Sequence, residues 1–496
     1  MRCDMSDRIQ PGGDSNGAEL PGRKLPAAVF GVASALLLST ACMIGPKYAC
    51  PAAPVPPAYK EAPPGGWREA RPSDAAVRGR WWTVYNDPRL DALEDRVSIS
   101  NQNVLAAEAQ FREAKAAVRI ARSGLFPTVS TTPSGTRSGG GSANGGGRNY
   151  SIPVELAYAV DIWGSIRRGV AGNSALAQAS AAQLENIRLI YQAELASDYF
   201  QIQGLDGERQ LLETTVQSYE RYVQLTQDRF DGGVASQGDV ALAQTQLETT
   251  RVQLADLEVQ RSQFEHAIAV LTGRPPFELS LAAAPAQTPP PESAISIPSA
   301  LLERRPDIAA AERQMASANE QIGIAKTAFF PALTLGAGAG LQAAAIGDLF
   351  TWPSRFWSLG PQLALTLFDA GKRHAQVRLT EAAYEATVAS YRQTVLTAFQ
   401  QVEDSLAQLR ILAAEAEIEN RAVAAAQRSL QISTDQYRGG VANYLQVITA
   451  QSSALQNQRA AVGIGTRRML ASVSLIQALG GGWDVTQLPS SRDVRK

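Results

Sequence analysis

The sequence predicts an α+β membrane protein in which long coiled-coil helices are combined with four β-strands per subunit. Three observations lead to this fold class. The chain contains an internal repeat, each copy holds a proline-free helix of unusual length, and each copy carries two stretches with the alternating pattern of β-strands. Four strands cannot close a barrel alone, so we expect several identical chains to pool their strands.

The internal repeat appears when residues 164–273 are compared with residues 371–480 at a constant shift of 207 positions. Glycines coincide at three points, which fixes the phase of the comparison. They are Gly164 with Gly371, Gly232-Gly233 with Gly439-Gly440, and Gly273 with Gly480. At a shift of 204 the repeat extends to the preceding helices, so the duplication spans roughly residues 88–273 and 304–480.

The N-terminus has the features of a bacterial lipoprotein signal peptide over residues 1–41. Arg23-Lys24 precede a short apolar run, and small residues lead to Cys42, whose sulfur would be acylated. Ser39 stands where such signals usually carry Leu, so an ordinary secretory signal cut nearby is the alternative. Cys3 would leave with the signal and Cys42 would carry lipid, so Cys50 would be the one remaining cysteine and we expect no disulfide.

The remaining chain divides into four predicted parts. Residues 42–80 are rich in Pro and Ala and form an acylated N-terminal linker. Residues 81–290 form the first repeat, residues 291–482 the second, and residues 483–496 a C-terminal tail. The first repeat opens with a helix predicted from Pro88 to about Arg122, because Asp is a favourable cap and Pro suits the first helical position.

Each repeat then contains a predicted β-hairpin, at about residues 125–162 and 329–369. Apolar residues alternate with small or polar ones there, which is the weak signature of barrel strands. The first strand, near Phe126–Arg137, alternates poorly and contains Pro133, so it is predicted from its counterpart in the second copy. The second connection is rich in aromatic residues that suit a membrane interface. The alternative is two soluble hairpins.

The long helices are predicted at Ser165–Phe230 and Lys372–Tyr437, and returning helices at Ser236–Leu271 and Asn443–Leu479. Each pair forms a coiled-coil hairpin with its tip at a double glycine, near residues 231–235 and 438–442. Apolar positions in the second long helix step by three and four residues, as in a left-handed coiled coil. They are Tyr384, Val388, Tyr391, Val395, Phe399, Val402, Leu406 and Leu409.

Composition excludes several classes of function. The chain has 46 basic and 47 acidic residues, a balance that argues against a nucleic-acid partner. His266 and His374 lie far apart on helices without Cys or carboxylates at ligand spacing, so we expect neither a metal site nor catalysis there. No motif for a nucleophile, nucleotide or cofactor is present, and we therefore expect no enzyme activity.

These features resemble the TolC-like outer-membrane efflux channels, specifically the lipoprotein branch that is similar to NodT and OprM. The matching segments run in order from Cys42 to about Gly482. They are Cys42 with Gly45-Pro46-Lys47-Tyr48, Trp81-Trp82, Asp87-Pro88-Arg89-Leu90, Leu125-Phe126-Pro127, Asp161-Ile162-Trp163-Gly164, Arg304-Arg305-Pro306-Asp307-Ile308, Phe329-Phe330-Pro331 and Tyr437-Arg438-Gly439-Gly440-Val441.

The resemblance implies a homotrimer whose strands form one twelve-stranded transmembrane β-barrel and whose helices form a periplasmic tunnel. It implies a passive exit duct for small molecules such as drugs, lipid-anchored in the outer membrane through Cys42, without a cofactor. The implied partners are a periplasmic adaptor and an inner-membrane pump of the resistance–nodulation–division class. The alternatives are a duct for type I protein secretion and a soluble periplasmic coiled-coil adaptor.

The tips of the coiled-coil hairpins are the candidate functional site. The resemblance implies that the tips close the periplasmic entrance, and the flanking charges Arg229, Asp231, Asp435 and Arg438 are candidates for an electrostatic latch. The glycines would serve the turns and contact the adaptor; they are Gly232, Gly233, Gly439 and Gly440. The alternative is a solvated surface turn, because exposed ion pairs contribute only about 0–1 kcal/mol each.

Overall fold

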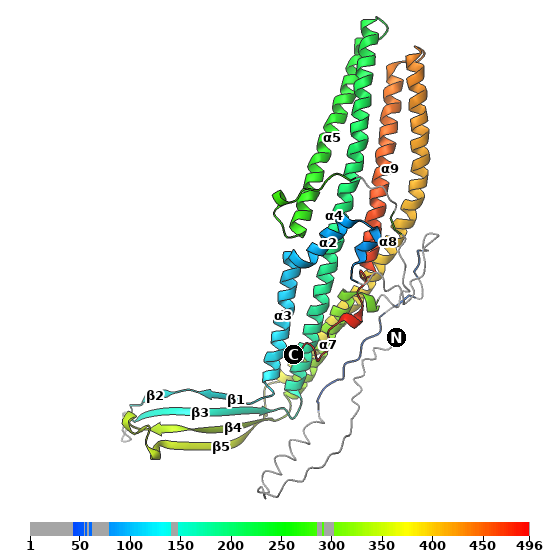
Figure 1. The fold of residues 1–496 in the computed structure, drawn as a ribbon. Coiled ribbons are helices and arrows are strands. Elements are labelled where there is room, and N and C mark those ends of the chain that lie inside the picture. Colours follow the sequence, from blue (N-terminus) through cyan, green and yellow to red (C-terminus); the bar gives the residue numbers. More distant parts are fainter. Residues whose placement is uncertain are drawn as a thin grey trace, which may run out of the picture.

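The computed structural model of this chain describes residues 43–53, 55–56, 59–61, 79–139, 147–284, 290–291 and 302–495. Two helical hairpins stand at one end of the molecule, shorter helices lie in the middle, and a β-sheet projects from the other end (Figure 1). Cys42 and the predicted signal peptide lie outside the described residues.

Two helices of 67 residues each, α4 (Ser165–Asp231) and α8 (Lys372–Arg438), run through most of the helical part (Figure 1). At 1.5 Å per residue each is about 100 Å long. Each is followed by a returning helix of 35 residues, α5 (Gln237–Leu271) or α9 (Tyr444–Ala478). All four helices begin and end within one residue of the predicted positions, because glycines and N-cap residues mark their ends.

The prediction of one helix over residues 88–122 is wrong in one respect. The structure has two helices there, α2 (Pro88–Ser100) and α3 (Gln102–Ser123), which are divided at Asn101. The Asn101 side chain accepts a hydrogen bond from the backbone N–H of Asn103 at 2.9 Å and donates one to the carbonyl of Leu271 at 2.9 Å. Asn101 therefore caps α3 and also joins it to the end of α5.

The helical body is completed by α7 (Pro306–Thr327), which is the second repeat's counterpart of α3 and packs against both α4 and α8. Short 3-10 turns lie at η2 (Trp81–Tyr85), η3 (Pro276–Glu278) and η6 (Val485–Gln487). The predicted coiled-coil positions of α8 from Tyr391 to Leu409 are buried against α7 and α9, and Tyr384 and Val388 pack at the margin of the same cluster.

The sheet has four rows of antiparallel strands, in the order β1 and β2, β3, β4, β5. The strands are β1 (Thr128–Thr131), β2 (Ser134–Arg137), β3 (Arg148–Val160), β4 (Ala332–Ala343) and β5 (Arg355–Ala364), with η4 (Ile346–Asp348) and η5 (Trp352–Ser354) between the last two. The first predicted strand is interrupted at Pro133, whose ring nitrogen has no hydrogen to donate. Both of its pieces pair with β3.

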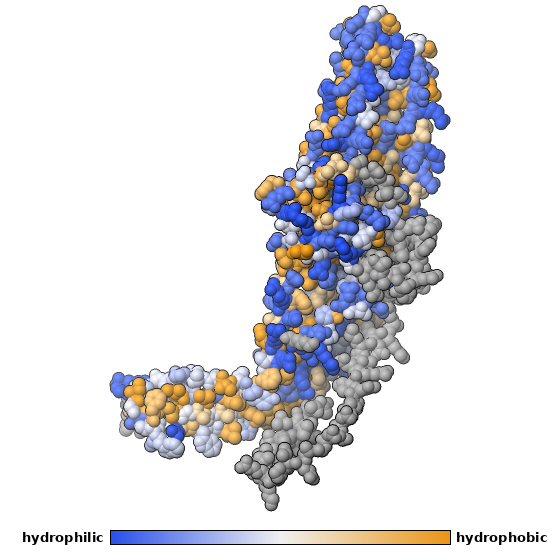
Figure 2. All heavy atoms as spheres, in the orientation of Figure 1, coloured by the Kyte–Doolittle hydropathy of each residue, from blue (hydrophilic) through white to orange (hydrophobic). Residues whose placement is uncertain are grey.

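The register places the apolar residues of all four rows on one face of the sheet. For example, Leu156 of β3 lies opposite Val129 of β1 and Ala337 of β4, and Ala337 lies opposite Leu359 of β5. The other face carries mainly small and polar residues. The apolar face is largely exposed, with Val129 at 67 % and Leu359 at 77 %. Hydrophobic residues are visible on the surface of the sheet in Figure 2. The apolar face is therefore suited to contact with a second apolar phase.

Candidate functional sites at the helical tips and the N-terminal segment

Each coiled-coil hairpin turns at a pair of glycines whose members differ in conformation. The second glycine, Gly233 or Gly440, has a φ of 75°, in the left-handed region where side chains are strained. The first, Gly232 or Gly439, remains in the right-handed helical region. Only the second glycine of each pair is therefore required by the backbone conformation of the turn.

The hydrogen bonds at both turns are those of a Schellman motif. The backbone N–H of Val234 donates to the carbonyl of Arg229 at 2.8 Å, and the same bond joins Val441 to Gln436 at 2.9 Å. These bonds occupy carbonyls that would otherwise be left without partners at the helix end. The tips are consequently compact turns of fixed geometry.

Arg229 joins the two tips within one subunit. Its guanidinium donates to the carbonyl of Tyr437 at 3.0 Å and lies 4.6 Å from the centre of the Tyr437 ring. A positive charge is favourable at the C-terminal end of α8, because the helix dipole is negative there. Sequence reasoning placed Arg229 at the tip but missed this contact, because its acceptor is 208 positions away.

The other three predicted latch residues face solvent. Asp231, Asp435 and Arg438 are exposed, and none of them forms an ion pair with another described residue of the subunit. The Asp231 carboxylate accepts a hydrogen bond from Gln227 one turn earlier, at 2.9 Å. One subunit therefore leaves two carboxylates and one guanidinium available at its tips.

A group of tyrosines packs the two hairpins together just below the tips. The Tyr222 hydroxyl lies 2.9 Å from the Thr434 hydroxyl, and the rings of Tyr437 and Tyr444 are 5.4 Å apart. Burial raises the pKa of the Tyr444 hydroxyl above its ordinary value. Tyr222 of α4 belongs to the same apolar cluster as Tyr437 and Tyr444, so this cluster holds the two tips together as well as Arg229 does.

The described chain begins next to the junction between helices and sheet. The backbone N–H of Ile44 donates to the carbonyl of Trp163 at 3.2 Å, between β3 and α4. A side chain at Gly164, which has a φ of 81°, would approach Met43 Cγ to 2.9 Å. Met43 and Ile44, the first described residues, therefore lie at the junction between the sheet and the helices.

The segment after Met43 is fixed by a buried arginine that sequence reasoning missed. Arg168, which is 3 % exposed, donates to the carbonyl of Ile44 at 2.7 Å and forms an ion pair of 2.6 Å with Glu320 on α7. Gly323 on α7 leaves the space for this guanidinium, because a Cβ atom there would overlap Arg168. The N-terminal segment therefore binds at a preformed site, where Gly45 packs against Arg168 and Gly323.

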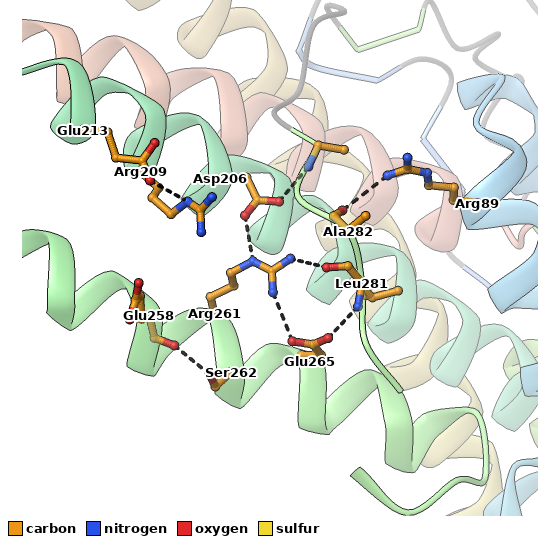
Figure 3. Close-up of polar contacts among 11 residues, drawn as sticks. Arg89, Asp206, Arg209, Glu213, Glu258, Arg261, Ser262, Glu265, Leu281 and Ala282 are labelled. Carbon is orange, nitrogen blue, oxygen red and sulfur yellow. Dashed lines mark hydrogen bonds and ion pairs between the residues drawn. The ribbon is translucent and has the colours of Figure 1, made fainter. Parts of the chain in front are cut away.

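A second polar network holds the chain that leaves the first repeat (Figure 3). Asp206 on α4 accepts a hydrogen bond of 2.7 Å from Arg261 on α5 and one of 2.9 Å from the backbone N–H of Ala284. Arg261 also donates to the carbonyl of Leu281 at 2.6 Å, and Glu265 accepts from the N–H of Leu281 at 2.6 Å. The network fixes residues 281–284 against both helices.

The two histidines lie apart. The His374 ring packs edge-on against Phe329, with 4.8 Å between ring centres, and His266 lies on α5. Among the described residues no three His, Cys, Asp or Glu side chains form a group that could hold a metal ion.

None of the described helices has both the length and the hydropathy needed to cross a membrane.

Comparisons with known proteins agree with this geometry. A family model described as outer membrane efflux protein matches residues 94–274 and 297–481. The pyoverdine export outer membrane protein OpmQ of Pseudomonas aeruginosa is 31 % identical over 463 residues, which cover 90 % of this chain and 96 % of OpmQ. The antibiotic efflux pump outer membrane protein ArpC of Pseudomonas putida is 32 % identical over 461 residues, which cover 89 % and 93 %. A solved structure of the outer-membrane channel OprN has a TM-score of 0.82 at 27 % identity, covering 89 % of this chain and all of OprN.

Long helical hairpins joined to a sheet with an exposed apolar face define an outer-membrane channel subunit. The family match covers most of the chain, and the chain therefore belongs to the outer membrane efflux protein family. It is an outer-membrane component of an efflux system, a duct for drugs or other toxic compounds that extends into the periplasm. The predicted family, efflux function and outer-membrane location are confirmed, as is the combination of long helices with a strand-based part.

Proposed function

We propose that three copies of this chain form one passive exit duct, in which four rows of strands from each copy close a twelve-stranded barrel. The open sheet is the observation that carries the proposal. Within the described residues, β5 and the row of β1 and β2 each pair on one side only. Unpaired backbone groups are very unfavourable in the apolar interior of a membrane. Pairing β5 of one copy with β1 and β2 of the next removes both edges.

The oligomeric state and the pore test this proposal together. We expect the purified protein in detergent to have the mass of a trimer by native mass spectrometry, and to form channels in planar lipid bilayers. We also expect the gene to restore resistance to toxic compounds in a strain that lacks its own channel of this family. A monomer that stays soluble without detergent would contradict the proposal.

The helical hairpins of the three copies would surround the periplasmic tunnel. The predicted repeats, residues 81–290 and 291–482, would then each supply one hairpin to the tunnel wall. The gap between the two matched segments of the family model, after residue 274 and before residue 297, supports a division near residue 290. Neither a catalytic step nor a cofactor is part of this proposal, because a duct needs only a shaped and hydrated path.

The exposed tip charges would close the entrance of the duct between subunits. Asp231, Asp435 and Arg438 have no ion-pair partner among the described residues of their own subunit, so a neighbouring tip can provide one. We expect reversal of both charges of the second tip, Asp435→Arg with Arg438→Asp, to alter single-channel conductance. Conductance equal to that of the wild type would leave these residues as an ordinary solvated turn.

The same tips would contact a periplasmic adaptor, which joins the duct to an inner-membrane pump of the resistance–nodulation–division class. The compact glycine turns support this role, since they let another helical hairpin approach the backbone closely. Cross-linking from a cysteine introduced at Val234, followed by mass spectrometry of periplasmic products, would identify the adaptor. Cross-links confined to other copies of the channel would contradict an adaptor contact.

A covalent lipid on Cys42 would anchor the mature chain. The position of Ile44 supports this role, because its backbone contacts Trp163 and Arg168 at the end of the sheet that would face the membrane. The mass of the purified N-terminal peptide should include the acyl chains, and Cys42→Ser should abolish them. An unmodified N-terminus created by cleavage elsewhere would instead indicate an ordinary secretory signal.

A further inference from the structure

Three arginines lie at the end of the sheet that is farthest from the helices. Arg137 of β2 lies directly opposite Arg148 of β3, and Arg355 is the first residue of β5. The strand β2 lies at the end of the sheet away from the helices (Figure 1). All three arginines are exposed. They therefore concentrate positive charge at the distal end of the sheet.

The register places these arginines on the apolar face of the sheet. Side chains two positions apart on a strand share a face, so Arg148 shares the face of Tyr150 and Ile152. Arg137 is on the same face because it lies opposite Arg148, and Arg355 is there because it lies opposite Leu341, which lies opposite Ile152. The charges consequently form the outer margin of the apolar surface.

The distal end of the sheet has too few acids to neutralise these charges. Residues 132–151 and 340–358 contain a single acidic residue, Asp348. None of the three arginines forms an ion pair with a described residue of the subunit. Like charges directly opposite each other destabilise a strand pair. Binding of an external anion between Arg137 and Arg148 would remove this repulsion.

Aromatic residues mark the level of Arg355 as a membrane interface. The Arg355 guanidinium lies 3.9 Å from the centre of the Trp352 ring, which is 76 % exposed, and Trp357 on the same strand is 80 % exposed. Tryptophans concentrate where acyl chains meet headgroups. The ring contact holds the guanidinium at this level and leaves its in-plane N–H groups available.

We propose that Arg137, Arg148 and Arg355 bind the phosphorylated headgroup of a lipid in the outer leaflet of the outer membrane. This inference rests on the proposed barrel, which puts the apolar face in contact with lipid. Guanidinium groups bind phosphate oxygens through two parallel hydrogen bonds, which makes arginine suited to this ligand. In the closed barrel, β5 of one copy adjoins β1 and β2 of the next. The headgroup therefore binds at the boundary between subunits.

The test compares lipid binding by the purified full-length protein and by R137Q/R148Q/R355Q, using native mass spectrometry with diphosphoryl lipid A as the probe. We expect binding of this lipid to weaken about a hundredfold in the variant, since each basic residue near an anionic surface strengthens binding several-fold. Binding of a lipid without phosphate, such as diacylglycerol, should be unchanged. The lysine variant R137K/R148K/R355K should retain most of the affinity.

Two controls separate this site from general charge effects. R378Q/R392Q/R428Q removes the same charge from exposed positions of α8 and should bind the lipid as the wild type does. Lipid A without phosphates should bind the wild type as weakly as diphosphoryl lipid A binds the glutamine variant, which tests the inference even if that variant fails to assemble.

Equal binding of diphosphoryl lipid A by the wild type and the glutamine variant would overturn the inference. Complete competition by millimolar inorganic phosphate would do so as well, because the site would then bind free phosphate. Neither result contradicts the proposed duct if the trimer and its conductance are unchanged. Loss of the trimer or the pore in the wild type would instead contradict the proposed function.

Discussion

At the scale of single residues, the two tips depend on a few atoms with distinct roles. Gly233 and Gly440 provide left-handed backbone, while Arg229 spans the distance between the hairpins. The sequence predicts the glycines because they punctuate both copies of the repeat. It does not predict the contact of Arg229 with Tyr437, because nothing local specifies an acceptor in the other copy.

The two glycines of a tip should respond differently to alanine. Gly233→Ala forces a Cβ atom into the left-handed region, which costs about 1 kcal/mol. We therefore expect amide hydrogen exchange in the last turn of α4 to become roughly fivefold faster, measured by mass spectrometry. In the matched control Gly232→Ala, the new Cβ atom meets its nearest described neighbour at 3.4 Å, an ordinary contact, so exchange should not accelerate.

Removing the guanidinium of Arg229 should loosen the entrance. Arg229→Met keeps the length of the side chain but loses its hydrogen bonds to α8, which are worth about 1 kcal/mol at a half-exposed site. We expect single-channel recordings to show a higher open probability, by roughly fivefold. Arg221→Met is the control, because among the described residues its guanidinium donates only within its own helix, to Gln217. Equal behaviour of the two variants would contradict a role for Arg229 in joining the tips.

At the scale of elements, sequence patterns predict most of the helices and less of the strands. Nearby residues determine the helix ends. Glycines end the long helices, and Ser236 and Asn443 cap the N-termini of the returning helices. The break at Asn101 has a local signal, because Asn is a favoured N-cap, but the hydrogen bond of Asn101 to Leu271, far along the chain, has none. Pro133 was recognised as unfavourable, but only the pairing of both strand pieces with β3 shows how the sheet accommodates it.

The ion pair that holds the connection between the repeats should be sensitive to the loss of one partner. Arg261→Met leaves Asp206, whose side chain is 1 % exposed, without its cation, and such losses destabilise by about 3–5 kcal/mol. Denaturant unfolding of the detergent-solubilised protein measures this. Arg209→Met breaks an exposed pair with Glu213 and should change stability by less than about 1 kcal/mol. Adding Asp206→Leu to Arg261→Met should recover most of the loss.

Asp198 on α4 should make stability depend on pH. Burial, together with the charge of Glu194 one turn earlier, raises its pKa to about 6. The ordinary pKa in an unfolded chain is about 3.9, so the stability that protonation provides is present below that value and is lost as pH rises through 6. Asp198→Asn should therefore raise Tm more at pH 8 than at pH 4. Thermal unfolding followed by circular dichroism measures both values of Tm. Asp256→Asn, at an exposed position of α5, serves as the control.

At the scale of the whole molecule, the sheet should discriminate between its two faces. Leu156 and its neighbour Ala157 point to opposite sides of β3. A positive charge on the lipid side costs about 2–4 kcal/mol near the middle of the membrane, whereas the interior of a barrel is hydrated. Leu156→Arg should therefore reduce the trimer recovered from outer membranes, and Ala157→Arg should not. The reverse result would place the apolar face inside the barrel.

Pairing of β3 with β4 joins the two copies of the duplicated unit edge to edge, and α7 of the second copy packs on α4 of the first. The peptide linkage between the copies is therefore not what keeps them together. If the chain is cut near residue 290 and the two fragments are expressed separately, we expect them to associate and to restore channel function. Such a split would allow each half of the duct wall to be labelled or redesigned independently.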